Sequence, residues 1–161
     1  MININYMRKD CEYIHYGRNF FDKNLFAPIK NDWVKPFGGF WASLVNDEYG
    51  WINWTKDNRY EIIKDKWIRF ILNSDRIIAL NSYDELTHLP HIKKQNELDK
   101  WILFDDLKHH YLDFEALSNS YDGMYVRISN DVRFDWGLQM WDCNSLLLFN
   151  PDVLQITEVS K

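Results

Sequence analysis

Three short segments of this chain carry residue types that can bind and position a ligand. Residues 13–17 form an apolar stretch that ends in His-Tyr-Gly and presents one imidazole, His15. Residues 38–43 begin with two glycines and continue with Phe, Trp, Ala and Ser, and residues 146–151 form an apolar run that closes on Asn-Pro. An imidazole can donate or accept a hydrogen bond, and large aromatic rings can stack on a planar group. The segments therefore predict a ligand-binding surface.

The composition predicts one domain that covers residues 1–161. The chain has 161 residues, of which 46% are hydrophobic and 17% aromatic, with eight tryptophans. This length and composition allow one well-buried core and leave too few residues for two ordinary domains. The aromatic content exceeds what such a core needs, so we expect some rings to line a ligand-binding surface.

Charge, cysteine content and the lack of long apolar stretches argue against several kinds of partner and site. With 19 basic and 24 acidic residues the formal charge is −5, which argues against duplex nucleic acid held through its phosphates as the main partner. The two cysteines have no metal-ligand spacing, and the histidines at 88, 91, 109 and 110 fit no zinc pattern, so no metal site is expected. No membrane-length apolar stretch appears, so we expect a cytoplasmic protein without a membrane partner.

The residue patterns favour an α+β domain in which strands dominate. Residues 18–37 are predicted to form a long irregular connection, and the runs at 60–63, 67–72 and 76–80 together predict a β meander. A Ser-x-x-Glu capping box predicts a helix from Ser82, and the charged stretch 91–100 is predicted to be a mobile surface. Further strands are predicted at 2–6, 12–16, 38–43, 124–128, 145–149 and 153–156, and further helices at 47–57 and 113–117.

Each candidate residue also has a structural interpretation. His15 could be a strand-end histidine that is satisfied by a backbone carbonyl. Trp41, Trp51 and Trp54 are individually more typical of core packing than of a ligand platform, although at least one is expected to face a cleft. Cys143 is most simply a small buried residue beside the strand that follows it.

Taken in order, the segments resemble the nicotinamide-binding frame of the ADP-ribosyltransferase superfamily, in its diphtheria-toxin-like and poly(ADP-ribose)-polymerase-like branch. His15, Tyr16 and Gly17 match the His-Tyr-Gly segment that binds the ribose and the carboxamide of NAD in that branch. The next strand of the branch carries a Gly-x-Tyr-Phe-Ala/Ser sequence, to which residues 39–43 correspond. The order of motifs is also similar to that of small bacterial and phage proteins.

The resemblance implies a role for individual residues in binding NAD as a substrate. Phe40 or Trp41 would provide the first ring against the nicotinamide, and Trp51 or Trp54 the second. Gly17 and the two glycines before Phe40 would leave room for this ring. The implied cofactor-binding residues are His15, Tyr16, Gly17, Gly39, Phe40, Trp41, Ser43, Trp51 and Trp54.

The position at which the branch carries its catalytic glutamate is occupied here by Asn144 and Ser145. The resemblance implies a mono-ADP-ribosyltransferase that modifies a protein or nucleic-acid acceptor, with His15 and either Asn144 or Asp142 as catalytic residues and Asp135 as a further acid. The alternative is a catalytically inactive module that binds a nucleotide or a partner protein. The implied fold is a split mixed β-sheet with a few short helices around an NAD-sized cleft.

Overall fold

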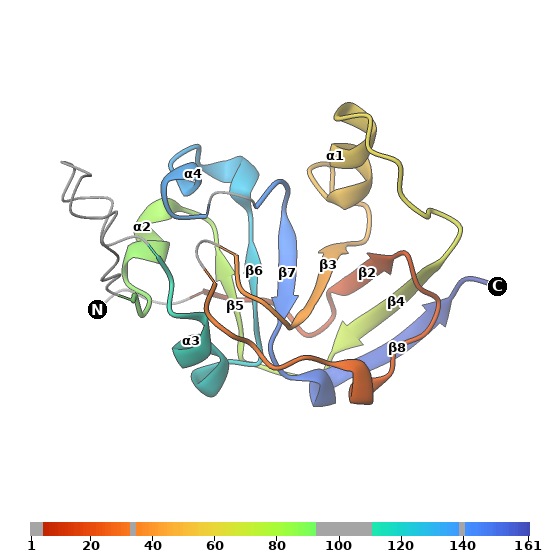
Figure 1. Ribbon diagram of the computed structural model, residues 1–161, viewed down its shortest axis with the longest axis horizontal. Helices are drawn as coiled ribbons and strands as arrows, with labels where there is room; N and C mark the ends of the chain where they lie inside the picture. The colour runs from red at the N-terminus through yellow and green to blue at the C-terminus, as the bar shows by residue number, and fades with distance from the viewer. Residues whose placement is uncertain (1–4, 33–34, 93–110, 139–140) are drawn as a thin grey trace.

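Eight strands of the described residues form one mixed sheet that curls around part of the hydrophobic core (Figure 1). The computed structural model describes residues 5–32, 35–92, 111–138 and 141–161. The strand order is β1-β5-β6-β7-β3-β2-β4-β8, and all neighbours are antiparallel except β5 and β6. The strands are β1 (Asn5–Tyr6), β2 (Glu12–Tyr16), β3 (Phe40–Leu44), β4 (Trp67–Leu72), β5 (Ile77–Leu80), β6 (Gly123–Val126), β7 (Ser145–Leu148) and β8 (Leu154–Val159).

Four short α-helices accompany the sheet in the described part of the chain, and two of them begin at side-chain caps. Ser82 accepts a hydrogen bond from the backbone N–H of Glu85, and Asp113 accepts one from that of Ala116. In Figure 1, α2, α3 and α4 lie on the side of β5, whereas α1 stands beyond the end of β3. The helices are α1 (Trp51–Asp57), α2 (Tyr83–Thr87), α3 (Phe114–Ser120) and α4 (Phe134–Gly137).

Strands β5, β6 and β7 are buried on both faces, and this explains the curl. Met124 and Leu147 belong to one core cluster, which includes residues of α2, α3 and α4. Tyr125 belongs to a second cluster on the opposite face, together with Ile68 and Phe70 of β4. Because alternate side chains of a strand point to opposite faces, one apolar face is covered by helices and the other by the curled half of the sheet.

The ladder between β2 and β3 is shorter than either of these five-residue strands. Only Tyr13 with Leu44 and Ile14 with Ser43 are paired, whereas β2 and β4 are paired over five residues. The two strands therefore diverge after Ile14. In Figure 1, β3 and β2 are the neighbouring arrows at which the curled half of the sheet begins. This divergence creates the space for the candidate site.

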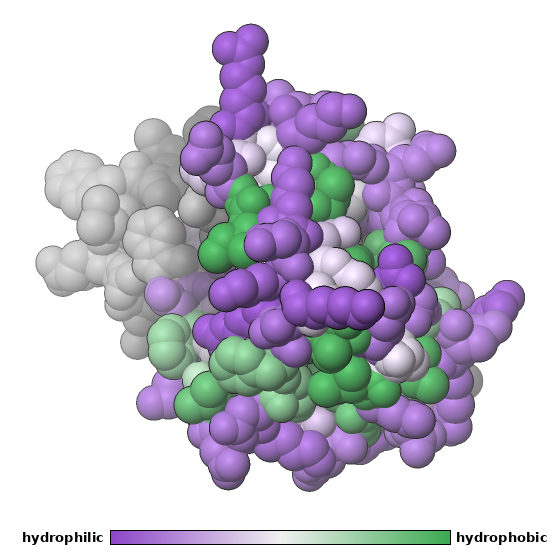
Figure 2. Space-filling view, turned by 90° about the vertical axis from the view of Figure 1, so that its right-hand side faces the viewer, coloured by the Kyte–Doolittle hydropathy of each residue, from purple (hydrophilic) through white to green (hydrophobic). Residues whose placement is uncertain are grey.

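The other edge of the curled half ends in β8, which is paired only with β4 among the described strands. The register shifts between Arg69 and Phe70, so that Thr157 of β8 lies in a bulge without a partner on β4. Ile156 and Val159 are 43% and 45% exposed. Figure 2 shows this side of the molecule as a mixture of apolar and hydrophilic side chains.

The α+β class is confirmed, but the predicted β meander is wrong. Residues 60–63 form no strand, and β4 and β5 are not neighbours, because β4 pairs with β2 and β8 while β5 pairs with β1 and β6. The helix predicted at 47–57 begins only at Trp51, after Gly50, and Asp47 accepts a hydrogen bond from the backbone N–H of Tyr49 instead. The surface stretch predicted at 91–100 lies outside the described residues from residue 93 onward.

Candidate functional site

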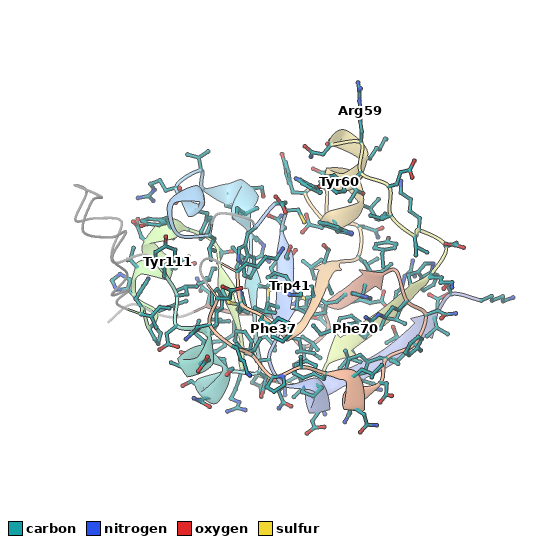
Figure 3. The ribbon with its side chains drawn as sticks, viewed as in Figure 1. Phe37, Trp41, Arg59, Tyr60, Phe70 and Tyr111 are labelled. Atoms are coloured by element: carbon teal, nitrogen blue, oxygen red, sulfur yellow. The ribbon has the colours of Figure 1, made fainter. Side chains whose placement is uncertain are left out.

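A cavity of about 240 Å³ opens where β2 and β3 separate. Residues 14–16 of β2 and 41–43 of β3 line it, together with Lys35, Trp51 at the start of α1, and the segment that leads into β7. Figure 3 places Trp41 in the middle of the molecule, between β7 and β3. The cavity thus joins three regions of the chain, within residues 14–16, 35–51 and 141–145.

The imidazole of His15 bridges the gap between the diverging strands. Its Nδ1 lies 2.7 Å from the carbonyl oxygen of Trp41, and since a carbonyl only accepts, Nδ1 carries the proton and donates. Burial lowers the pKa of His15, against a smaller opposite effect of the Trp41 carbonyl, and the charge of Arg18 lowers the pKa further. At neutral pH the imidazole is therefore uncharged, and its Nε2 has a lone pair that can accept a hydrogen bond.

Aromatic rings form two walls of the cavity. Trp51 stacks on Trp54 with ring centroids 5.2 Å apart and an angle of 14° between the planes, and Trp54 contacts Tyr60 at 5.4 Å. On the other wall, Trp41 meets Trp141 edge to face at 4.7 Å. Rings that are held by other rings offer a rigid surface, so these walls suit a planar ligand.

The hydroxyl of Ser43 fixes the distance between the two walls. Its Oγ accepts a hydrogen bond of 3.0 Å from the backbone N–H of Trp51 and donates one of 3.2 Å to the carbonyl oxygen of Asn144. Ser43 is only 3% exposed, so these bonds form away from bulk water. A single buried side chain therefore connects the start of α1 to the segment before β7.

Asn144 belongs to a buried network behind the cavity wall and does not line the cavity. Its Nδ2 donates to the carboxylate of Asp47 at 3.2 Å, and its Oδ1 accepts from the backbone and side chain of Ser129. Tyr125 Oη also donates to Asp47. These bonds occupy both ends of the Asn144 amide, so it orders the segment before β7 instead of facing a ligand.

The segment before β7 contributes Asp142, Cys143 and Ser145 to the cavity. Asp142 is exposed and is the one carboxylate that lines the cavity in the described part of the chain. Burial raises the pKa of the Cys143 thiol, which therefore stays protonated at neutral pH and reacts slowly as a nucleophile. Ser145 Oγ donates to the Cys143 carbonyl at 2.9 Å. The ionisable groups at the cavity are thus one neutral imidazole, one carboxylate, one ammonium group, the phenol of Tyr16 and the thiol of Cys143.

The structure brings His15, Tyr16, Trp41, Ser43, Trp51 and Asp142 together at this cavity. Trp54 lies behind Trp51, and Phe40 lies in a second cavity, because successive side chains of β3 point to opposite faces. The side chain of Asp135 lies outside the described part of the structure.

We expected the glycines to leave room for a ligand; open space lies beside Gly17, although Gly17 does not line the cavity, whereas Gly38 and Gly39 are closely packed. A Cβ on Gly39 would come within 2.6 Å of Leu147 Cδ1 and 2.7 Å of Ile29 Cδ1, so the space beside this glycine is filled by the core. Gly17 has a φ of 98°, which favours glycine, and its role is to turn the chain after β2.

The residue-by-residue assignment missed Lys35, Trp141, Cys143 and Ser145. Lys35 Nζ lies 4.7 Å from the centroid of the Trp41 ring, close enough for a cation–π interaction. Lys35 lies just before the segment 38–43, and the other three residues lie beside Asp142 and Asn144, so nearness in sequence was the signal that could have identified them.

No protein-family model, curated protein or solved structure matches this chain. Across the described residues, no group of three or more His, Cys, Asp or Glu side chains is arranged to hold a metal ion. In the same part of the chain, no helix combines the length and the apolar character needed to cross a membrane. The function must therefore be argued from the chemistry of the cavity.

Proposed function

We propose that the cavity binds the nicotinamide end of NAD and that the protein is an NAD-dependent mono-ADP-ribosyltransferase. The observation that carries this proposal is that His15 of β2 and Trp41 of β3 line one cavity with Trp51, as the resemblance in sequence requires. The short ladder between β2 and β3 supports it further, because a sheet of the ADP-ribosyltransferase type must part at this place to admit the ligand.

The size of the cavity favours one ring and its sugar over a whole dinucleotide. Its volume of about 240 Å³ lies just below the range of about 300–1,000 Å³ that is common for pockets enclosing drug-sized ligands. The nicotinamide ring would lie between the walls that hold Trp41 and Trp51, and the adenosine part would extend over the protein surface. Lys35 at the cavity could attract the negatively charged phosphates.

The reaction would break the bond between the nicotinamide nitrogen and ribose C1′, and the bonding electron pair would leave with the nicotinamide. The acceptor's nucleophile would form the new bond to C1′ and lose its proton. His15 Nε2 is free to accept a hydrogen bond from a ribose hydroxyl and so hold the sugar in place. The Asp142 carboxylate would stabilise the positive charge that develops on the ribose and accept the acceptor's proton.

The test is to incubate the protein with labelled NAD and a cell extract and to measure both nicotinamide release and label transfer. His15→Ala should abolish both, and Asp142→Asn should lower the rate by about 10²–10⁴, the usual contribution of an acid or base. His88→Ala and Asp65→Asn are matched controls, because both residues are exposed and lie away from the cavity. Full activity in His15→Ala would show that the cavity is not the active site.

A second candidate function is a module that binds the nucleotide without turning it over. The position of Asn144 favours it, because this residue replaces the expected glutamate and is bonded to Asp47 and Ser129 behind the cavity wall. Calorimetry with NAD separates the two functions, since binding without nicotinamide release supports the module. Trp51→Ala should weaken binding by about 1–3 kcal/mol if the ring stacks on the ligand, whereas Trp67→Ala should not. The absence of NAD binding would exclude both functions.

A further inference from the structure

A second cavity, of about 210 Å³, lies on the other side of the contact between His15 and Trp41. Both residues line both cavities, so the hydrogen bond between them forms part of a common wall. The second cavity is covered by the connection between β2 and β3 and not by the segment before β7. We call it the Arg18 cavity, after the one cation among its described lining residues.

The walls of the Arg18 cavity are mostly aromatic and aliphatic. Phe21 and Phe40 contact each other edge to face, with centroids 5.0 Å apart, and Phe26 also lines the cavity. Phe20 and Leu25 line it as well, although they are 53% and 63% exposed. Exposed apolar side chains that border a cavity leave apolar area in water, and an apolar ligand would remove that area.

Arg18 gives the Arg18 cavity an unpaired positive charge. It has no hydrogen bond or ion pair with any other described residue, whereas Arg8, Arg69, Arg76 and Arg133 each pair with a carboxylate. Its charge is felt by the neighbouring imidazole, since it contributes to the lowered pKa of His15. A guanidinium presents a planar fork of donors that matches a carboxylate.

Asp22 is the one described carboxylate on the same cavity. Its Oδ1 accepts hydrogen bonds of 2.9 Å from the backbone N–H and from the side-chain amide of Asn24. The carboxylate is thus engaged in its own turn and is not paired with Arg18. It should nevertheless repel an anionic ligand at short range. The cavity therefore carries two charges of opposite sign, and each can be removed by a separate substitution.

We propose that the Arg18 cavity binds a small apolar carboxylic acid, with its hydrocarbon part among the phenylalanines and its carboxylate on Arg18. The volume of about 210 Å³ is below the range of about 300–1,000 Å³ of drug-sized pockets, so a ligand with one ring or a short alkyl chain fits it best. This ligand is different from the nucleotide proposed for the first cavity, and the proposal does not depend on that function.

The test uses calorimetry with 4-phenylbutyrate and its uncharged counterpart 4-phenyl-1-butanol, without any nucleotide. The acid should bind about tenfold more tightly than the alcohol, as expected for a charge-assisted bond near the surface. Arg18→Gln should remove this preference, whereas Asp22→Asn should increase it because a like charge is lost. Arg59→Gln is the matched control, since Arg59 is exposed and lies on the turn after α1.

A further pair of variants tests the apolar part of the site. Phe20→Ser and Leu25→Ser should weaken the acid and the alcohol alike, and urea unfolding would verify that these exposed changes leave the fold intact. Equal affinity for acid and alcohol in the natural chain would overturn the proposal. So would an unchanged preference in Arg18→Gln, a weaker preference in Asp22→Asn, or no saturable binding of the acid.

Discussion

The two edges of β3 are held in different ways. Along one edge, Phe40, Trp41 and Ala42 pair with three successive leucines of β7. Along the other edge, pairing with β2 stops after Ser43, and the carbonyl of Trp41 receives its hydrogen bond from the imidazole of His15. One edge is therefore closed by backbone and apolar packing, and the other is kept open by side chains.

The difference shows what an open strand edge requires. The leucines of β7 are fully buried, so regular pairing and the hydrophobic effect suffice on that side. On the open side, every buried polar group needs a specific partner, since an unsatisfied one would cost free energy. The side chains of His15, Ser43 and Asn144 provide these bonds and at the same time shape the cavity.

The largest expected effect concerns the closed edge. Leu147→Ala should lower the free energy of unfolding by about 2–5 kcal/mol, because it removes buried methyl groups and leaves a cavity. The measurement is urea unfolding. Leu25→Ala, at a residue that is 63% exposed, should change stability by less than about 0.5 kcal/mol. Similar values for the two variants would contradict the assignment of β7 to the core.

A smaller effect is expected in the network behind the open edge. Tyr125→Phe removes the hydroxyl that donates to Asp47 and should lower the free energy of unfolding by about 1.5–3 kcal/mol, the value of a hydrogen bond to a charged group. The control is Tyr49→Phe, because Tyr49 is 61% exposed. If the two changes had the same effect in urea unfolding, the Asp47 network would not stabilise the fold.

A still smaller effect should depend on pH. The pKa of His15 is lowered below its ordinary value of 6.5 in the folded protein, so the unfolded chain binds a proton more readily. His15 therefore contributes stability above pH 6.5 that is lost as the pH falls through the folded pKa. Urea unfolding between about pH 5 and 8 should show a weaker dependence on pH in His15→Gln than in the natural chain.

His88→Gln is the control for that experiment, because it also replaces one imidazole, at an exposed residue outside the cavity. If the free energy of unfolding of His15→Gln depended on pH in the same way as that of the natural chain, the imidazole of His15 would not titrate as a buried group.

The smallest change to the protein is chemical labelling of its two cysteines. Cys11 is half-buried and Cys143 is buried, with a pKa raised mainly by burial, so iodoacetamide should modify Cys11 first. Mass spectrometry would follow both sites, and Cys11→Ser would isolate the slow reaction. NAD should slow the labelling of Cys143 further if it fills the first cavity. Faster labelling of Cys143 than of Cys11 would show that the reagent reaches the open edge of β3 more easily than the burial of Cys143 indicates.

Much of the local structure could be predicted because its causes are local. The prediction of a strand at 12–16 is confirmed by β2, and that at 67–72 is confirmed by β4, whose alternate side chains are buried. The Ser82 cap is confirmed as well, since it depends on residues within one turn. These features need no knowledge of distant partners.

The pairing of distant segments could not be predicted in the same way. The run at 60–63 is rich in residues that favour strands, yet Tyr60 packs on Trp54 and Ile63 is 53% exposed, so contacts with α1 override propensity. The neighbours of β5 are set by parallel pairing with β6, which is distant in sequence. For the same reason, the sequence left Asn144 and Asp142 as alternatives for the catalytic residue near the acceptor. Only the tertiary structure distinguishes them, because Asn144 is bonded behind the cavity wall whereas Asp142 lines the cavity.

The bulge at Thr157 affects how copies of this chain meet. A flat outermost strand is a template on which another chain can add hydrogen bonds and lengthen the sheet. At β8 the irregular spacing disturbs that template, and Thr157 Oγ1 is held by a 2.8 Å bond to Glu12 Oε1. The last strand therefore discourages pairing with the edge of a second copy at a place where Ile156 and Val159 are partly exposed.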